Sequence, residues 1–423
     1  MIGQFRSFER PVQLLLVNQL TINIGFYMLM PYLADHLSVT LGLATWLVGL
    51  VLGVRNLSQQ GMFLLGGSLA DRWGYKPVIV AGCALRTGGF ALLALVDSLP
   101  ALLIASAATG FAGALFNPAV RAYLAHDAGA RRVEAFALFN VFYQAGILAG
   151  PLIGLALTGV SFRLTCLVAA ALFAVLTVLQ IRALPPRNAP RPDQPRHVLA
   201  GWRDVLANRS FLLFSTAMVG TSVLSFQTYL ALPLEINRLA ATSEAATIGV
   251  AAMFALSGLV AITCQVRVTR WCTARWGAGR SLPAGLVMLG AAFVLPATVA
   301  AQPKATTMAG TVLALTPVLI AAVLLTLGTL VIYPFEMDTI VTLARGHLVA
   351  THYGLYNTIA GLGIALGNLA TGGLLDLSGA IGHPRLPWLA LALIGLACAA
   401  AVHTLSRRGH LVPVAAEATA GAR

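Results

Sequence analysis

The sequence predicts an all-α membrane protein with twelve transmembrane helices in two pseudo-symmetric six-helix bundles. Three observations predict this fold. The chain of 423 residues is 58% hydrophobic and only 10% charged, whereas an ordinary soluble domain carries about 25% charged residues. Apolar runs of about 20 residues, the length that crosses the hydrocarbon core, recur along the chain. Short basic gaps separate many of these runs. We therefore expect lipid to cover the outer surface.

The apolar runs give the expected spans. The first six lie at 11–33, 42–68, 77–97, 100–123, 134–158 and 161–183, and the second six at 210–235, 246–266, 282–301, 317–342, 352–375 and 386–406. The stretch 302–316 is also apolar, so the connection between the ninth and tenth spans is the least defined. The expected domains are an N-terminal bundle at 1–183, a cytoplasmic linker at 184–209, a C-terminal bundle at 210–406 and a cytoplasmic tail at 407–423.

The basic residues predict the orientation. If both termini are cytoplasmic, all but six of the 27 Lys and Arg residues lie in the cytoplasmic segments or at the cytoplasmic ends of the spans. An excess of positive charge marks cytoplasmic loops. The same distribution accounts for the net charge of +13. It argues against a nucleic-acid partner, because the basic residues do not share one soluble face. Membrane lipids are the expected acidic neighbours.

The two halves repeat short patterns on either side of the proline-rich linker. The matched sets are Tyr27 and Pro31 with Tyr229 and Pro233, Arg72-Trp73-Gly74 with Arg275-Trp276-Gly277, Pro118 with Pro334, and Asn140, Gly146 and Gly150 with Asn357, Gly363 and Gly367. Four matches in the same order indicate a duplication. Two related bundles that move about a central site are a common design among secondary transporters.

The loop after the second span reads GSLADRWGYKP at 67–77. Gly67 permits close helix contact and Gly74 a tight turn, while Asp71, Arg72 and Lys76 supply charges. Asp71 is placed to meet positive partners or the positive end of a helix. The alternative interpretation is an ordinary basic turn exposed to water.

A second motif, GILAGPLIG at 146–154, lies in the fifth span. Its small residues Gly146, Gly150 and Gly154 favour close packing on a neighbouring helix, and Pro151 favours a kink. Plain helix packing is the simpler interpretation of the same pattern.

Together these motifs resemble those of the major facilitator superfamily. The loop matches its signature G-x-L-A-D-R-x-G-x-K, and the span-five motif is similar to the G-x-x-x-G-P-x-x-G of its drug:proton antiporters. GVR at 53–55, QQG at 59–61, FNP at 116–118 and LPW at 386–388 resemble MdtH-type multidrug resistance proteins. The resemblance implies twelve helices, a location in the bacterial inner membrane, proton-coupled efflux and a conformational switch in the loop. This sequence departs from the family pattern at two positions: Asn18 stands where many antiporters carry an acidic residue, and Ser106 where they carry an arginine.

Two arginines lie inside expected spans, where ionisable groups are costly and suggest function. Arg55 is near the middle of the second span and Arg86 near the middle of the third, without a carboxylate at matching depth. Arg55 either faces the cavity and attracts an anionic group or is held by amides such as Gln59. For Arg86, in a span that is usually peripheral in this architecture, the structural interpretation is preferred.

Proton coupling needs a group that titrates. The candidates at the ends of cavity-lining spans are Glu235, Asp35, Glu336 and Asp338, with Glu235 preferred because it follows Pro233 within the apolar run. Exposure at the membrane interface is the alternative for each. The remaining cavity candidates, which would equally serve as contacts between helices, are Asn23, Tyr27, Asn117, Tyr143, Gln144, Gln227, Tyr229, Tyr333 and Asn357. A mostly apolar cavity with a few amides and aromatic rings suits amphipathic, drug-like molecules.

Several function classes find no support in the sequence. It has no G-x-x-x-x-G-K-[ST] motif for ATP, no metal motif and no catalytic nucleophile pattern, so we expect neither cofactor nor metal nor enzymatic activity. The five cysteines follow no disulfide framework. A monomer is the default for this architecture.

The leading hypothesis is a secondary active transporter that exports drug-like or metabolite small molecules by proton antiport. The alternative, which rests on Arg55, is an importer or facilitator of an organic anion or siderophore-like solute. A membrane enzyme or receptor is a third class, for which the chain has neither a catalytic pattern nor a soluble sensory domain.

Overall fold

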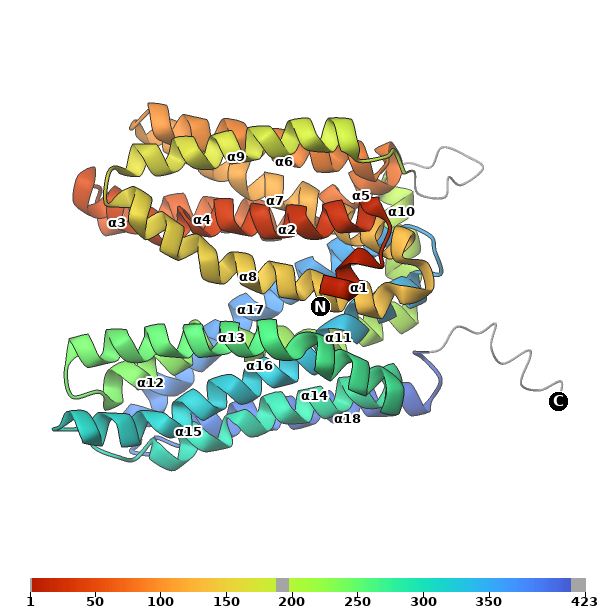
Figure 1. Ribbon diagram of the computed structural model, residues 1–423. Helices are drawn as coiled ribbons and strands as arrows, with labels where there is room; N and C mark the ends of the chain where they lie inside the picture. The colour runs from red at the N-terminus through yellow and green to blue at the C-terminus, as the bar shows by residue number, and fades with distance from the viewer. Residues whose placement is uncertain (1, 188–197, 412–423) are drawn as a thin grey trace. The chain divides into compact units, whose positions relative to one another are not determined.

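A computed structural model describes residues 2–187 and 198–411, apart from the side chains of residues 31, 34, 35, 39 and 45. Throughout the described residues the chain forms helices and turns. It divides into two compact units: unit 1 is Met1–Asn208 with Ile340–Thr358, and unit 2 is Arg209–Thr339 with Ile359–Arg423. Figure 1 shows the helices of each unit.

Unit 1 contains most of the first half. Its helices are α1 (Ile2–Arg6), α2 (Arg10–Tyr27), α3 (Met30–Asp35), the π-helix η1 (His36–Thr40), α4 (Thr45–Gln60), α5 (Phe63–Trp73), α6 (Tyr75–Leu95), α7 (Leu99–Ala128), the 3₁₀-helix η2 (Gly129–Arg131), α8 (Arg132–Thr158), α9 (Phe162–Ala183) and α10 (Val198–Ala207). Two helices are shared with unit 2, namely α16 (Met308–Ala344) and α17 (Val349–Ala380).

Unit 2 holds the rest. Its own helices are α11 (Arg209–Phe226), α12 (Ala231–Leu239), α13 (Ser243–Arg275), α14 (Gly277–Ala292), α15 (Val294–Val299) and α18 (Leu386–Arg407). The tenth expected span begins at Met308, nine residues earlier than expected, because the apolar stretch before Pro317 continues α16. Each expected span is occupied by helix, and several are broken into two pieces.

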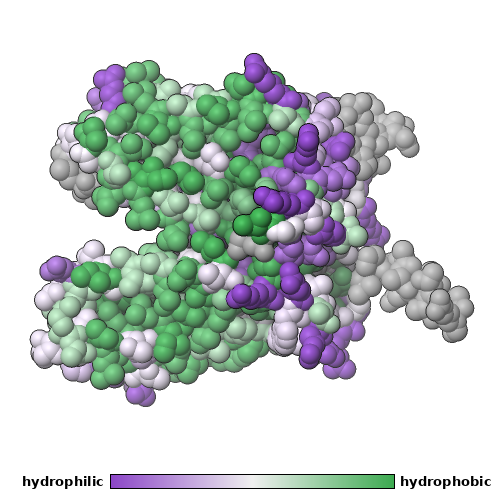
Figure 2. Space-filling model, in the orientation of Figure 1, coloured by the Kyte–Doolittle hydropathy of each residue, from purple (hydrophilic) through white to green (hydrophobic). Residues whose placement is uncertain are grey.

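Within the described residues, nine helical segments are long and apolar enough to cross a membrane. One of these segments, Leu99–Thr158, covers both the fourth and fifth expected spans. On the face shown in Figure 2, apolar side chains form a broad band on each unit, and hydrophilic side chains gather toward the ends of its helices. This arrangement is what a bilayer requires of a helical protein.

The helix break in the first span has a counterpart in the seventh. α2 ends at Tyr27 and α3 follows with Pro31 in its first turn, and α11 ends at Phe226 before α12, which contains Pro233. Proline has no amide hydrogen for the carbonyl four residues earlier, which is that of Tyr27 or Tyr229. The repeated Tyr–Pro pair therefore corresponds to a repeated break.

In unit 1, α7 packs against α4, α5 and α6, while α6 also packs on α9 (Figure 1). Small residues make the approach possible. A Cβ on Gly110 of α7 would overlap the carbonyl of Arg55 in α4, and one on Gly66 of α5 would overlap the carbonyl of Ala114 in α7. Close backbone contact between helices is the usual role of such small residues in membranes.

The segment after α9 is hydrogen-bonded to the C-terminal end of α7 in unit 1. Tyr123 donates its hydroxyl to the carbonyl of Pro185 at 2.7 Å, and Arg187 Nε lies 3.0 Å from Asp127 Oδ1. The side chain of Asp127 is 2% exposed, and its hydrogen bond raises the pKa of Arg187. α10 follows within the expected linker, and Trp202 donates to Ser68 Oγ in α5 at 2.7 Å.

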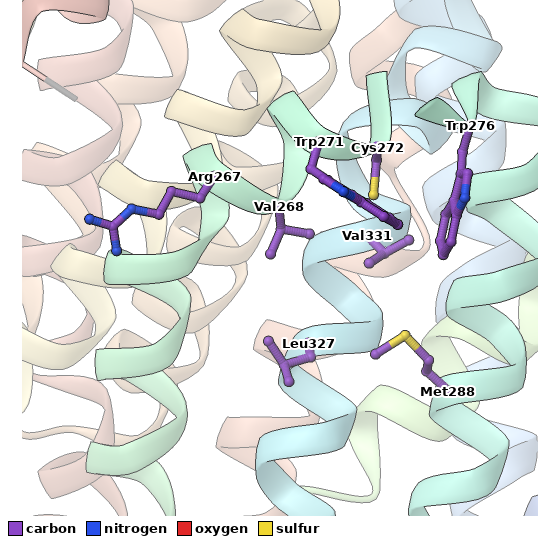
Figure 3. Close-up of a pocket in the computed structure, with 8 residues that line it drawn as sticks. All are labelled: Arg267, Val268, Trp271, Cys272, Trp276, Met288, Leu327 and Val331. Atoms are coloured by element: carbon purple, nitrogen blue, oxygen red, sulfur yellow. The ribbon is translucent and has the colours of Figure 1, made fainter. Parts of the chain in front are cut away.

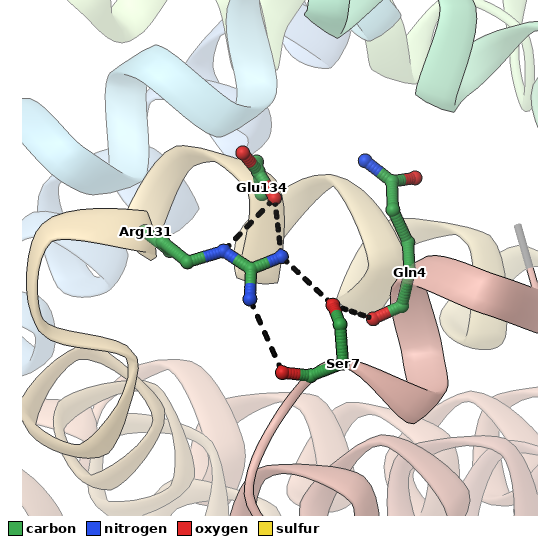
Figure 4. A network of polar contacts seen from close by, with 4 residues as sticks. All are labelled: Gln4, Ser7, Arg131 and Glu134. Carbon is green, nitrogen blue, oxygen red and sulfur yellow. Dashed lines mark hydrogen bonds and ion pairs between the residues drawn. The ribbon is translucent and has the colours of Figure 1, made fainter.

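The N-terminal helix α1 is tied to the start of α8. Arg131 reaches Glu134 at 2.7 Å and also donates to the Oγ (3.0 Å) and the carbonyl (3.2 Å) of Ser7 (Figure 4). Ser7 Oγ in turn donates to the carbonyl of Gln4 at 2.7 Å. The ring of Phe8 lies 4.1 Å from the Arg131 guanidinium. Arg131 thus connects the segment between α1 and α2 to the start of α8.

Candidate functional site

The carboxylate of Asp71, at the end of α5, caps the N-terminus of α17. Its Oδ1 accepts from the Ala350 amide at 3.1 Å, and its Oδ2 accepts from the Thr351 amide and hydroxyl, each at 2.7 Å. The first amides of a helix have no partner within the helix and carry partial positive charge. Asp71 therefore has the role of an N-cap supplied from a distant segment.

The glycines of the same loop make this contact possible. A Cβ on Gly67 would overlap the carbonyl of Ala350, so a side chain there would push α17 away from α5. Gly74 has φ = 90°, a conformation that side chains disfavour. Lys76 donates to the carbonyl of Ile181 at 2.8 Å in the last turn of α9, whereas Arg72 is exposed.

Burial raises the pKa of Asp71 to about 6, although the three hydrogen bonds from Thr351 and Ala350 act in the opposite direction. Desolvation disfavours the charged carboxylate, and the amides and hydroxyl favour it. The balance leaves Asp71 able to take up a proton only slightly below neutral pH. The contact is consequently sensitive to pH.

The loop between α16 and α17 adopts a left-handed backbone at three residues. The φ angles are 51° at Arg345, 72° at Gly346 and 50° at Leu348. Such angles are uncommon for residues other than glycine. Sequence reasoning missed Thr351 as the partner of Asp71, because nothing in the local sequence links two segments so far apart.

The glycines of the span-five motif lie against α2. A Cβ on Gly146 would come within 2.5 Å of Asn23 Cβ, one on Gly150 within 2.8 Å of Tyr27 Cβ, and one on Gly154 would overlap the Met28 carbonyl. Tyr32 donates its hydroxyl to the carbonyl of Pro151 at 2.7 Å. The motif thus provides a smooth helix face, in accord with the packing interpretation.

Unit 2 shows the same arrangement for the repeated glycines. Gly363 and Gly367 of α17 lie against Val219 and Val223 of α11. The contacts there are side-chain methyl groups, at 2.5 and 2.6 Å from the positions of added Cβ atoms. The duplicated sequence pattern therefore corresponds to a duplicated helix pair.

Arg55 and Arg86 both lie beside the ring of Phe26 in unit 1. Their Cζ atoms are 4.8 and 5.0 Å from the ring centroid, and Arg86 is also 5.4 Å from the ring of Phe173. Gln59 lies next to Arg86, since a Cβ on Gly113 would be 3.0 Å from both Gln59 Cδ and Arg86 Nη2. Sequence reasoning found both arginines but not Phe26.

The other cavity candidates of unit 1 differ in environment. Asn23 is buried and donates to the carbonyl of Gln19 at 2.7 Å, and Tyr27 stands edge-on to Phe26. Asn357 accepts from Arg121 at 2.9 Å. The half-buried residues are Asn117, Tyr143 and Gln144. Asn23 and Asn357 thus have hydrogen bonds within unit 1, and the sequence had left this role open.

Three of the cavity candidates lie in unit 2. Gln227 is fully buried and donates to the carbonyl of Val223 at 2.9 Å and to Asn368 at 3.2 Å. Tyr229 is 55% exposed, and its ring packs against Phe226 and Phe254. Tyr333 is half-buried in α16.

The four candidates for proton coupling differ in burial and in their partners. Glu235 is buried and forms a two-pronged ion pair with Arg238, with distances of 2.6 and 2.9 Å. Arg238 also donates to the carbonyls of Val299 and Gln302. Glu336 is buried in α16 and Asp338 is half-buried. The side chain of Asp35 lies outside the described residues.

The comparisons with known proteins agree with this geometry. The family model described as Major Facilitator Superfamily matches residues 15–367. The chain belongs to the Major Facilitator Superfamily. It is a membrane-spanning transporter of that superfamily, with the helical fold that the sequence predicts.

Two relatives of this superfamily are similar over nearly the whole chain. An uncharacterized MFS-type transporter of Mycobacterium tuberculosis is 53% identical over 401 residues, which is 95% of this chain and 94% of the relative. The multidrug resistance protein MdtH of Klebsiella pneumoniae is 30% identical over 399 residues, or 93% of each chain. The resemblance to MdtH-type proteins expected from the sequence is therefore confirmed.

A solved structure shares the fold. It is an auto-inhibited peptide transporter of the POT family, with a TM-score of 0.63 at 17% identity, covering 95% of this chain and 97% of that one. At this identity the likeness concerns the major facilitator fold alone. The exact number of twelve spans remains a prediction from the sequence.

Unit 2 of this major facilitator protein has an apolar pocket of about 480 Å³ between α13, α14 and α16. Its lining, drawn in Figure 3, consists of Arg267, Val268, Trp271, Cys272, Trp276, Met288, Leu327 and Val331. Trp271 is 48% exposed, so the pocket opens on the surface of the unit. It contains none of the candidate site residues.

The described residues contain no cluster of three or more His, Cys, Asp or Glu side chains able to hold a metal ion. The five cysteines, at 83, 166, 264, 272 and 398, are free thiols. The arrangement comprises charged side chains bonded at helix ends and closely packed helices.

Proposed function

We propose that this protein exports amphipathic small molecules by secondary active transport, driven by inward proton flow. The observation that carries the proposal is the cap that Asp71 places on the N-terminus of α17. It joins the family's loop motif to a helix through three hydrogen bonds and one charge. The name of the relative MdtH, a multidrug resistance protein, supports drug-like substrates.

The transport cycle that we propose makes and breaks this cap. In alternating access, two related bundles move about a substrate site and expose it to one side at a time. A contact that changes with the state must be strong enough to hold and weak enough to release. One carboxylate at a helix terminus, worth about 0.3–2 kcal/mol, fits that requirement. Gly67, Gly74 and Lys76 shape the loop around it.

For the coupling proton we propose Glu336 or Glu235, with Asp338 and Asp35 as further candidates. Both glutamates are buried in unit 2. Glu235 forms a two-pronged ion pair with Arg238, and opening this pair would leave a buried charge without its partner. If Glu235 carries the proton, the pair must open during transport. Glu336, the other buried glutamate, is an equal candidate.

As substrate-binding candidates we propose, in unit 1, Asn23, Tyr27, Arg55, Gln59, Asn117, Tyr143, Gln144 and Asn357, and, in unit 2, Gln227, Tyr229 and Tyr333. Amides and aromatic rings among apolar side chains suit amphipathic solutes. We further propose a monomer in the bacterial inner membrane, with both termini cytoplasmic and acidic lipids beside the basic loops.

The decisive experiment uses sealed vesicles that contain the purified protein and a fluorescent pH reporter. An imposed proton gradient is followed while cationic, neutral and anionic compounds are added in turn. Proton movement on addition of a compound supports antiport. Compound movement without proton movement would contradict antiport, and uptake of an anion together with protons would favour the import alternative.

The coupling residue is tested in the same vesicles. Glu336→Gln and Glu235→Gln are compared with Glu244→Gln, a matched change at an exposed position in the first turn of α13. We expect the true coupling variant to retain exchange of compound down its gradient while losing proton-driven accumulation. If all three variants keep accumulation at the wild-type level, neither glutamate carries the proton.

A further inference from the structure

Two positive charges share one aromatic ring in the interior of unit 1. The Cζ atoms of Arg55 in α4 and Arg86 in α6 lie 4.8 and 5.0 Å from the ring centroid of Phe26 in α2. The two guanidinium carbons therefore lie no more than about 10 Å apart. Like charges repel strongly where water is scarce, so this arrangement calls for a compensating negative charge.

Arg86 lies near the middle of α6, a helix that is long and apolar enough to cross a membrane. It stands eleven residues after Tyr75 and nine before Leu95, the ends of α6. At 1.5 Å per residue it is about 16 Å from one end of the helix and about 14 Å from the other. The side chain is 6% exposed. Guanidinium groups stay charged in proteins, and a charge at this depth is costly and usually functional.

The polar partners of the two arginines within the described residues are few. Arg55 donates to Asn56 Oδ1 at 3.0 Å and to the sulfur of Met30 at 3.6 Å. The Nε of Arg86 is buried and has no hydrogen-bond partner among the described side chains. A guanidinium has five donors, so most of the donors on Arg55 and Arg86 have no partner within the described part of the chain.

Few carboxylates occur on the helices around the two arginines. Between residues 10 and 126 the acidic residues are Asp35, Asp71 and Asp97, and the side chain of Asp35 lies outside the described residues. Asp71 caps α17, and Asp97 lies beyond the end of α6. Among the side chains that the structure describes, no carboxylate forms an ion pair with Arg55 or Arg86.

We infer that Arg55 and Arg86 form a receptor for the acidic group of a transported organic anion, a carboxylate attached to an apolar body. Arg55 is half-buried and is the group that touches the carboxylate, while Arg86 lies behind and adds its field. A planar carboxylate matches the forked donors of a guanidinium. Phe26 and Met30 beside Arg55 suit the apolar body.

This inference rests on the proposed transport function, whose substrate class it specifies. The competing explanation is that the rings of Phe26 and Phe173 alone hold the arginines by cation–π contact. The two explanations differ in what purified protein does with an anion when no gradient is present. Binding, and not transport, is therefore the decisive measurement.

The probes are 2-naphthoate and its uncharged amide, 2-naphthamide, titrated calorimetrically into purified full-length protein in detergent micelles. We expect naphthoate to bind at least tenfold more tightly than naphthamide. Arg55→Gln should abolish this preference, and Arg55→Lys should retain part of it. Arg163→Gln, which removes the same charge at an exposed position in α9, should keep the full preference.

Equal affinities of the wild-type protein for the two probes would overturn the inference, as would a preference for naphthoate that survives Arg55→Gln. Arg86→Gln should also weaken naphthoate binding, but its burial puts folding at risk, so the half-buried Arg55 carries the test. The vesicle assay is independent: proton-driven export without anion binding refutes only the receptor, and anion binding without transport refutes only the exporter.

Discussion

Asp71 caps a helix whose first turn lies about 280 residues further along the chain. Its carboxylate combines a low-dielectric position, which raises the pKa, with three donors, which lower it, and burial outweighs the donors. The outcome is a group with a pKa of about 6, above the 3.8 of a free carboxyl. Because the folded protein holds the proton more tightly than the unfolded chain, protonation of Asp71 favours the folded state.

We predict that lowering the pH from 7 to 5 stabilises the wild-type protein relative to Asp71→Asn. Over this range the folded state takes up most of one proton at Asp71, while the unfolded chain takes up almost none. The stabilisation is complete below pH 3.8 and is lost as the pH rises through 6. Thermal unfolding of both proteins as a function of pH measures the difference. Parallel pH profiles would contradict the pKa assignment.

Arg238 is a second residue whose role is local and electrostatic. It pairs with Glu235, which is 5% exposed, and is itself 39% exposed. We predict that Arg238→Gln destabilises the protein by about 1–3 kcal/mol, because a buried carboxylate loses its partner; the partial exposure of Arg238 reduces the cost below that of a fully buried pair.

The control is the double variant Glu235→Gln with Arg238→Gln, which removes both charges. It should recover at least half of the lost stability, as a double-mutant cycle would reveal. A double variant as unstable as the sum of the two single variants would mean that the pair does not interact.

At the scale of elements, helix pairs are positioned by glycines at their contacts. α8 approaches α2 closely enough that Gly154 meets backbone, whereas Gly363 of α17 meets only a valine methyl of α11. A side-chain methyl moves more easily than a carbonyl fixed in a helix. The same sequence pattern therefore produces contacts of different stiffness in the two units.

We predict that Gly154→Ala destabilises the protein by about 1–3 kcal/mol, as overpacking does, and that Gly363→Ala costs less. Gly88→Ala in α6 is the control, since its added Cβ has open space and alanine favours helix. The buried thiols Cys83, Cys166 and Cys272 report unfolding when a fluorogenic maleimide reacts with them on heating. Equal costs for the first two variants would refute the distinction.

At the scale of the whole molecule, the distribution of charge predicts the orientation in the membrane. Basic residues gather in the loops expected on the cytoplasmic side, and Lys304 is one of the few expected outside. Lys304 is exposed in the connection before α16, which makes it accessible to reagents.

We predict that Lys304→Cys, in a background lacking the five native cysteines, reacts with a membrane-impermeant maleimide added to intact cells. Ser7→Cys, also at an exposed position, should react only after the cells are opened. Labelling of Ser7→Cys in intact cells would reverse the assigned orientation.

The sequence by itself determined the helical membrane fold, the family and the motifs, because a bilayer imposes length, hydropathy and charge rules that act locally along the chain. It also identified Asp71, Arg55 and Arg86 as unusual. It did not reveal that Asp71 meets Thr351, that Phe26 lies beside both arginines, or that Glu235 is paired with Arg238. The first two are contacts between helices remote in sequence, and the third depends on side-chain direction within α12, so only the tertiary structure decided them.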